Sequence, residues 1–316
     1  MRIGYFLSTE EYDPASLLEQ ARAAERAGFQ ALWISDHFHP WNDAQGQSPF
    51  VWSMIGALSQ ACRLPVTTSV TCPIMRIHPA IIAQAAATSA VLHEGRFVLG
   101  VGTGEALNEH IFGDPWPPAA VRLEMLEEAV ELIRRLWTGE VVRHYGEHYT
   151  VENARIYTLP EEPPPIYVSA FGPKAVKVAA RIGDGYIGAE PKREIVDRFR
   201  TNGGANKPCQ ASFKAAYAET EEEGVRLAHE RWTSDALPGE LPQVLPSPRH
   251  FEQVSSLVTP KMMREKFVCG KDPEAHLRKI EEYRQAGYDE VYVGSTGPHH
   301  QELIQMYAEH VLPAVA

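Results

Sequence analysis

The chain has 316 residues, 44% of them hydrophobic, which is enough for one large barrel or for two average domains. Its net charge of -11 and its 30 dispersed lysines and arginines disfavour nucleic acid as a partner, because phosphate backbones attract basic surfaces. The sequence holds no run of the roughly 18 apolar residues that a bilayer span requires, so we expect no membrane insertion.

Strand-like apolar runs alternate with helix-like segments from the N-terminus onward. The first strand is expected at residues 3–7, and Asp13-Pro14 then predicts a helix with an N-cap and a first-turn proline, ending at Gly28. The next strand and helix pairs are expected at 31–34 with 50–61, 64–70 with 80–92, and 97–101 with 121–136.

The second half of the chain continues this order after an insertion. Residues 141–149 alternate around Tyr145-Gly146 and predict a hairpin. Further pairs are expected at 166–170 with 173–181, 185–188 with 193–200, and 212–217 with 221–232. The proline-rich stretch 233–259 is expected to form an irregular lid or insertion. The last predicted elements are a strand-like run at 267–269, a helix at 273–286, an eighth strand at 290–294 and a helix at 301–311.

Eight alternations with short connections favour one fold, an α/β single (β/α)8 TIM barrel over residues 1–316, with insertions near 141–157 and 233–265. A doubly wound nicotinamide-binding sheet is the rival. It would need glycines directly after the first strand, where the chain has Ser8-Thr9-Glu10-Glu11-Tyr12.

A polar run, Ser35-Asp36-His37-Phe38-His39-Pro40-Trp41, follows the second predicted strand. Residues just past the carboxyl end of a barrel strand line the active site, so His37 is a candidate acid or base. The alternative is a capped turn in which Asp36 starts a helix and Trp41 fills the core.

A glycine-rich run, Gly100 to Glu109, follows the fourth predicted strand. Its glycines would let the backbone lie against a flat or phosphorylated ligand, and Glu105 and Asn108 stand one helical turn apart. Tight packing of the strand against a helix explains the glycines equally well. A third turn, Ser169 to Lys174, opens a helix and is either an anion site or a plain helix start.

Four segments together resemble the luciferase-like oxidoreductases that depend on the deazaflavin coenzyme F420, in particular their sugar-phosphate dehydrogenases. They are SDHFHPW at 35–41, TSVTCP at 68–73, GVGTGEALNE at 100–109 and AARIGDG at 179–185. The resemblance is strong over residues 1–190 and loose between about 200 and 260. It implies hydride transfer between an alcohol carbon and F420. The alternatives are an FMN-dependent monooxygenase of the same fold and a noncatalytic cofactor-binding barrel.

The resemblance also implies roles for single residues. Its catalytic group is His37, Glu105, Trp41 and Glu10. The family leaves open whether His37 or Glu105 accepts the proton; we favour His37, because an imidazole serves both directions near neutral pH.

Cofactor contacts are implied at Asp36 and at a nonprolyl cis peptide between Ser69 and Val70. The other implied cofactor-binding residues are Thr103, Gly104, Asn108, Ser169, Ala170, Phe171, Gly172 and Pro173.

The resemblance implies only part of a substrate-binding site. Sugar-phosphate oxidisers hold the phosphate with three cations; Lys192 stands at the first position, and Lys266 replaces an arginine at another. The third position falls within 241–243, which has no basic residue, although Arg249 or Lys261 could take its place in space. A sugar phosphate therefore stays a lead beside other alcohols, and Lys192 could equally be a solvated helix-start residue.

The remaining expectations concern metals, location and assembly. No histidine group has the spacing of a metal site, so we expect no metal. Scattered cysteines favour a reducing, cytoplasmic location. The resemblance implies a homodimer.

Overall fold

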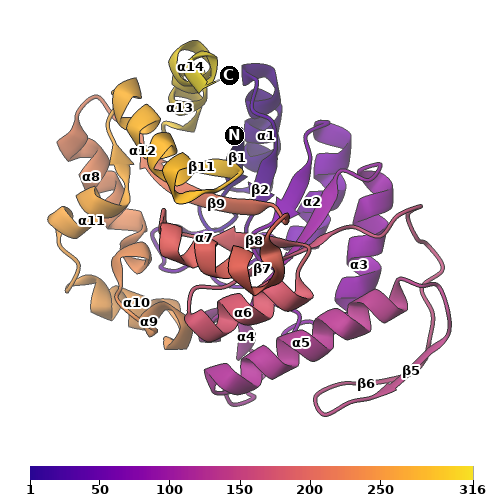
Figure 1. Cartoon of the computed structure of the whole chain (residues 1–316). Coiled ribbons are helices and arrows are strands. Elements are labelled where there is room, and N and C mark those ends of the chain that lie inside the picture. The colour runs from indigo at the N-terminus through magenta and orange to yellow at the C-terminus, as the bar shows by residue number, and fades with distance from the viewer. Residues whose placement is uncertain (316) are drawn as a thin grey trace.

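The structure, a computed structural model, describes residues 1–315. Within these residues eight parallel strands close into a cylinder, because each pairs with the next and the last pairs with the first (Figure 1). The strands are β1 (Arg2–Leu7), β2 (Leu32–Ile34), β3 (Val66–Thr68), β4 (Phe97–Val101), β7 (Ile166–Ser169), β8 (Gly185–Gly188), β9 (Cys209–Ala216) and β11 (Glu290–Ser295). The predicted (β/α)8 barrel is confirmed.

Helices surround this cylinder, and the first shows why they form where the sequence indicates. The Asp13 carboxylate accepts the amides of Ala15 and Ser16 at 2.9 and 3.1 Å, and Gly28 ends the helix at φ +94°. The main surrounding helices are α1 (Pro14–Ala27), α2 (Val51–Ala61), α3 (Pro79–Leu92), α5 (Ala119–Leu136), α6 (Pro173–Ile182), α7 (Arg193–Phe199), α8 (Glu221–Arg231), α12 (Pro273–Ala286) and α13 (His300–Met306). Shorter elements are α4 (Ala106–Glu109), η1 (Arg200–Gly204), η3 (Tyr307–Val311) and α14 (Leu312–Val315). None of the helices in this part of the chain is both long and apolar enough to cross a bilayer.

Aromatic side chains fill the inside of the cylinder. Trp33 and Tyr292 stack with ring centroids 4.5 Å apart, and the Trp33 indole donates to Gln210 Oε1 at 2.9 Å. Gly4 makes room for this pair, because a Cβ there would lie 2.3 Å from the Tyr292 ring. The interior is therefore packed, and the open polar end of the barrel lies at the carboxyl ends of the strands.

Two segments interrupt the alternation of barrel strands and helices. The first is an antiparallel hairpin of β5 (Val142–Tyr145) and β6 (Thr150–Ala154), which Figure 1 shows beyond one end of α5. The second was expected to be irregular, and this is wrong: it holds η2 (Thr233–Ala236), α9 (Leu241–Val244), α10 (Pro248–Ser255) and α11 (Pro260–Lys266). Three of its prolines, Pro242, Pro248 and Pro260, fall in the first turns of the three α-helices, where a missing N–H costs nothing, and Pro238 and Pro246 lie outside the helices.

The second insertion returns to the barrel through β10 (Val268–Cys269). This strand pairs in parallel with Ala215 and Ala216, the last residues of β9. Figure 1 shows α8, α9, α10 and α11 together on one side of the cylinder. The insertion thus ends on the rim of the barrel.

Candidate active site

His37 and Glu10 meet at the carboxyl ends of β1 and β2. His37 Nε2 lies 3.3 Å from Glu10 Oε1, and the two side chains are 9% and 3% exposed. Two residues that the resemblance placed in the catalytic group therefore form a contact pair.

Ser35 holds Glu10 in this position. Its hydroxyl donates to Glu10 Oε2 at 2.6 Å, and the Thr9 amide donates to Ser35 Oγ at 2.9 Å. Sequence reasoning assigned no role to Ser35, although it opens the polar run that singled out His37. The hydroxyl fixes one carboxylate oxygen and leaves the other facing the imidazole.

Asn108 links His37 to Glu105. Its Oδ1 accepts the amides of Phe38 and His39 at 2.9 and 3.2 Å, which fixes the direction of the side-chain amide. Its Nδ2 then faces His37 Nδ1 at 3.1 Å and Glu105 Oε2 at 3.5 Å. The structure brings His37, Asn108 and Glu105 together.

Glu105 occupies the N-cap position of α4, after the three glycines, and its side chain makes no capping hydrogen bond to the helix. Burial raises the pKa of its carboxyl, although the His37 charge and the Asn108 hydrogen bond act in the opposite direction. Glu105 therefore keeps its proton to higher pH than an ordinary glutamate does.

Trp41 forms a wall beside His37. The two rings lie 5.0 Å apart at 59°, and the other side of the indole meets Phe251 of α10 at 5.0 Å. The alternative that Trp41 only fills the core is therefore incomplete, since its ring is part-buried and contacts the imidazole. The second insertion contributes to this wall.

Asp36 lies in a buried ion pair that the sequence did not indicate. Its Oδ1 accepts from Arg76 Nη2 at 2.7 Å and its Oδ2 from the Thr71 hydroxyl at 2.8 Å. Arg76 also reaches Glu109, whose Oε2 accepts the Arg76 amide at 2.9 Å. The contact of Asp36 with the cofactor stays a prediction.

Burial raises the pKa of Glu109 to about 7, against the opposing charge of Arg76. Nothing in the residues around Arg76 distinguishes it in the sequence. Only the fold shows that it joins the loop after β3 to those after β2 and β4.

The glycines after β4 are required by packing. A Cβ on Gly100 would lie 1.9 Å from the Thr68 carbonyl oxygen, and one on Gly102 would lie 2.8 Å from Val70 Cγ2. Packing thus accounts for these two glycines, although against β3 and the segment that follows it and not against a helix as the alternative supposed. Gly104 has φ +68°, and a Cβ there would meet Cys72 Sγ at 2.5 Å. The peptide bond between Ser69 and Val70 is cis, as predicted.

The turn from Ser169 to Pro173 leaves the start of α6 open. Gly172 is the N-cap and has no side chain to cap the helix, and Phe171, Gly172 and Pro173 are exposed. Free amides at a helix N-terminus attract anions. This end of α6 fits the phosphate group of a cofactor tail.

Lys192 and Lys266 come together on one carboxylate. Lys192 Nζ lies 2.5 Å from Glu190 Oε2, and Lys266 Nζ contacts Glu190 Oε1. Sequence reasoning did not single out Glu190. At the third expected cation position Gln243 Oε1 instead accepts from the Arg122 guanidinium at 3.1 Å.

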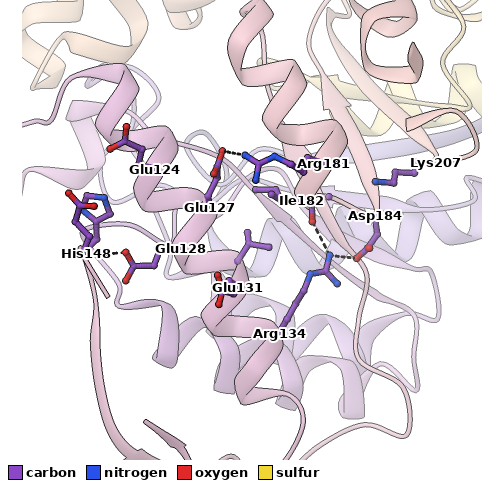
Figure 2. Close-up of a pocket in the computed structure, with 13 residues that line it drawn as sticks. Glu124, Glu127, Glu128, Glu131, Arg134, His148, Arg181, Ile182, Asp184 and Lys207 are labelled. Carbon is purple, nitrogen blue, oxygen red and sulfur yellow. Dashed lines mark hydrogen bonds and ion pairs between the residues drawn. The ribbon is translucent and has the colours of Figure 1, made fainter. Parts of the chain in front are cut away.

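A hollow of about 640 Å³ lies elsewhere, between α5 and α6 (Figure 2). Figure 2 shows two ion pairs there, Arg181 with Glu127 at 2.5 Å and Arg134 with Asp184 at 2.8 Å. Asp184 precedes β8, so this hollow lies toward the opposite end of the barrel from His37. Among residues 1–315, no three His, Cys, Asp or Glu side chains form a group that could hold a metal ion.

Comparison with known proteins identifies the family. The sequence profile of the family described as "Luciferase-like monooxygenase" matches residues 1–290. The chain belongs to this luciferase-like family.

Two luciferase-like relatives match along their whole length. The F420-dependent glucose-6-phosphate dehydrogenase of Microbacterium testaceum (strain StLB037) is 34% identical over 325 residues, covering 99% of this chain and 97% of the relative. The enzyme of the same name from Nakamurella multipartita is also 34% identical, and the match covers 99% of this chain and 96% of that enzyme.

A solved luciferase-like structure agrees with this match. An F420-dependent secondary alcohol dehydrogenase in complex with an F420-acetone adduct superposes with a TM-score of 0.94 at 31% identity, over 100% of this chain and 99% of its own. A coenzyme F420-dependent tetrahydromethanopterin reductase from Methanopyrus kandleri, with a TM-score of 0.79 at 18% identity, shares the fold.

Proposed function

We propose that this protein is an F420-dependent oxidoreductase that transfers a hydride between the carbon of a CH–OH group and the deazaflavin. Full-length relatives named F420-dependent glucose-6-phosphate dehydrogenase and the F420-dependent secondary alcohol dehydrogenase support this assignment. The observation that carries it is the contact of His37 with Glu10 on one side and with Asn108, beside Glu105, on the other. Such a group handles the proton that must leave a hydroxyl when its carbon loses a hydride.

The residues present fit the cofactor. The uncapped start of α6, with exposed Gly172 and Pro173 and no acidic residue in its first turn, suits a phosphodiester. Bound F420 would supply the carbon that accepts or returns the hydride. We assign the cofactor border to Asp36, Ser69, Val70, Thr103, Gly104, Asn108 and the turn from Ser169 to Pro173.

His37 is our proposed proton acceptor, with Glu10 as its partner. In the neutral ring Nδ1 accepts from Asn108 and Nε2 donates toward Glu10. When the ring gains a proton at Nδ1, this N–H can donate to the His39 carbonyl oxygen at 3.1 Å while Nε2 still faces the Glu10 carboxylate. The Asn108 Nδ2 donor must then turn away from Nδ1, so proton uptake by the ring requires a small shift of the Asn108 side chain.

Glu105 and Trp41 complete the proposed site. Because burial raises the pKa of Glu105, its carboxyl can hold a proton close to the reacting groups. The Trp41 indole covers one side of the His37 ring and excludes water from it.

Titration of the purified protein with F420 and with FMN tests the assignment. We expect F420 to bind and its visible absorbance to fall when an alcohol substrate is oxidised. Binding of FMN with oxygen consumption would overturn the proposal in favour of a monooxygenase. Binding of F420 with no turnover of any alcohol would favour a noncatalytic cofactor-binding barrel.

We also propose a homodimer in the cytoplasm. The four cysteines are all free in the structure, which suits a reducing compartment. Light scattering after gel filtration tests the dimer, and a single-subunit mass would contradict it.

A further inference from the structure

Glu190 stands at the rim of the barrel and receives two lysines. It is the second residue after β8, and each of its carboxylate oxygens contacts one ammonium group. Lys192 is the N-cap of α7, whereas Lys266 is the last residue of α11 in the second insertion. Two cations from separate parts of the chain therefore share one carboxylate.

The backbone around this group is fixed. The Glu190 carbonyl oxygen accepts the Lys192 amide at 2.8 Å and the hydroxyl of buried Tyr288 at 3.0 Å. Lys266 directly precedes Phe267 and β10, and β10 pairs with the end of β9. The carboxylate is thus held where the two lysines converge.

The carboxylate also stays charged. Its partial burial alone would raise the pKa of Glu190, but the hydrogen bonds from Lys192 and Lys266 outweigh this and lower it. The side chains remain reachable by solvent, at 38% exposure for Glu190, 53% for Lys192 and 43% for Lys266. A dissolved anion can therefore reach the two lysines, but there it comes into contact with the negative charge of Glu190.

This arrangement treats charged and uncharged substrates differently. A phosphate group that bound both lysines would have to displace Glu190 or lie beside it, and like charges in contact are unfavourable. A tethered group also acts at a high effective concentration, on the order of millimolar or above, so a free anion competes poorly. An uncharged hydroxyl compound meets neither obstacle.

We propose that Glu190 is a specificity residue that takes the place of an anionic substituent at the rim and restricts this enzyme to uncharged alcohols. The inference rests on the proposed function, since it concerns the substrate of that same site. It separates the two activities named among the relatives, because glucose 6-phosphate is an anion and acetone is neutral. Sugar phosphates are then poor substrates despite the two lysines.

The test measures kcat/KM with F420 for glucose 6-phosphate and for 2-propanol, the alcohol that corresponds to acetone. In the unchanged protein we expect 2-propanol to be the better substrate. Glu190→Gln should raise the ratio of the two values by about tenfold in favour of glucose 6-phosphate, as removal of a charge clash predicts. Adding Lys192→Ala and Lys266→Ala to that variant should abolish the gain.

A matched control separates this effect from the loss of any surface ion pair. Glu219 binds Lys271 in another exposed Lys–Glu pair that shares no residue with the Glu190 group, and Glu219→Gln should leave the ratio unchanged. Glu190→Ser serves as a second variant if Glu190→Gln is poorly folded.

Two results would overturn the inference while leaving the proposed function standing. One is a preference of the unchanged protein for glucose 6-phosphate, and the other is an unaltered ratio in Glu190→Gln. If no alcohol reacts, the proposed function fails, and calorimetry with inorganic phosphate then tests Glu190 without turnover. Tighter phosphate binding by Glu190→Gln, by about tenfold, supports the inference, and equal binding overturns it.

Discussion

Two groups of charged side chains at the same end of this barrel differ in how deeply they are buried. Around His37, the pairs His37–Glu10 and Arg76–Asp36 have side chains that are at most 9% exposed. At the rim, Lys192, Glu190 and Lys266 are between 38% and 53% exposed. Both groups place basic side chains in contact with carboxylates, so burial is the property that separates them.

This difference indicates what each group is for. Breaking a buried pair leaves a charge without water or a partner, so such a pair fixes one geometry. An exposed pair is screened and contributes little stability, so it can change without loss of the fold. We therefore expect the buried group to set the chemistry and the rim group to set the substrate.

The largest expected effect is on the reaction at the buried group. His37→Ala should lower turnover by about 10²- to 10⁴-fold, because it removes the proposed proton acceptor, while F420 affinity changes only slightly. Stopped-flow absorbance of F420 measures the first and fluorescence titration the second. Unchanged turnover would remove His37 from the mechanism. His310→Ala, an exposed histidine near the C-terminus, is the control.

The next effect is on stability. Arg76→Met should lower the free energy of unfolding by about 3 to 5 kcal/mol, because Asp36 and Glu109 would stay buried without their cation. Urea denaturation followed by fluorescence measures it. Arg63→Met breaks an exposed pair with Glu94 and should cost no more than about 1 kcal/mol. Equal losses in the two variants would contradict the comparison.

The pH dependence of stability gives a smaller effect. The pKa of Glu109 is about 7 in the folded protein against an ordinary 4.5, so the folded state binds more protons between these values. The contribution of Glu109 to the free energy of unfolding is therefore fully present below about pH 4.5 and is lost as the pH rises through 7. The total loss is about 3 kcal/mol.

Urea denaturation at pH 5 and pH 7.5 measures this loss. Glu109→Gln should make the difference between the two pH values smaller by about 2 kcal/mol, because part of the full loss falls below pH 5. The exposed hairpin variant Glu147→Gln should behave like the unchanged protein. A pH dependence that survives Glu109→Gln in full would show that other groups cause it.

The smallest effect belongs to the rim. Glu190→Ala should change the free energy of unfolding by less than about 1 kcal/mol, since its ion pairs are exposed. Thermal and urea denaturation check this. A loss as large as that of Arg76→Met would mean that the rim group is structural.

The sequence predicted the barrel well because its information is local and periodic. Asp13, Pro14 and Gly28 mark the ends of α1 within a few residues, and the apolar runs mark the strands. The second insertion was misjudged because prolines break helices in their interior but are favoured in a first turn.

The candidate site was predicted only in part. His37, Glu10, Glu105 and Asn108 were found through strand ends and the family resemblance, and they do lie together. Sequence reasoning missed Ser35, Arg76 and Glu190. Each contacts a residue that is distant in the sequence: Ser35 contacts Glu10, Arg76 contacts Asp36, and Glu190 contacts Lys266. Contacts between charged side chains that are far apart in the chain leave no local pattern in a single sequence.

The contact of Trp41 with Phe251 has a consequence for redesign of this enzyme. The loop after β2 and α10 together form the wall beside His37, while α11 of the same insertion carries Lys266. Grafting that insertion from another barrel would alter both this wall and the charge at the rim in a single exchange. Exchanging residues 233–266 as a block, with position 41 adjusted to match, is therefore the sound route to new selectivity.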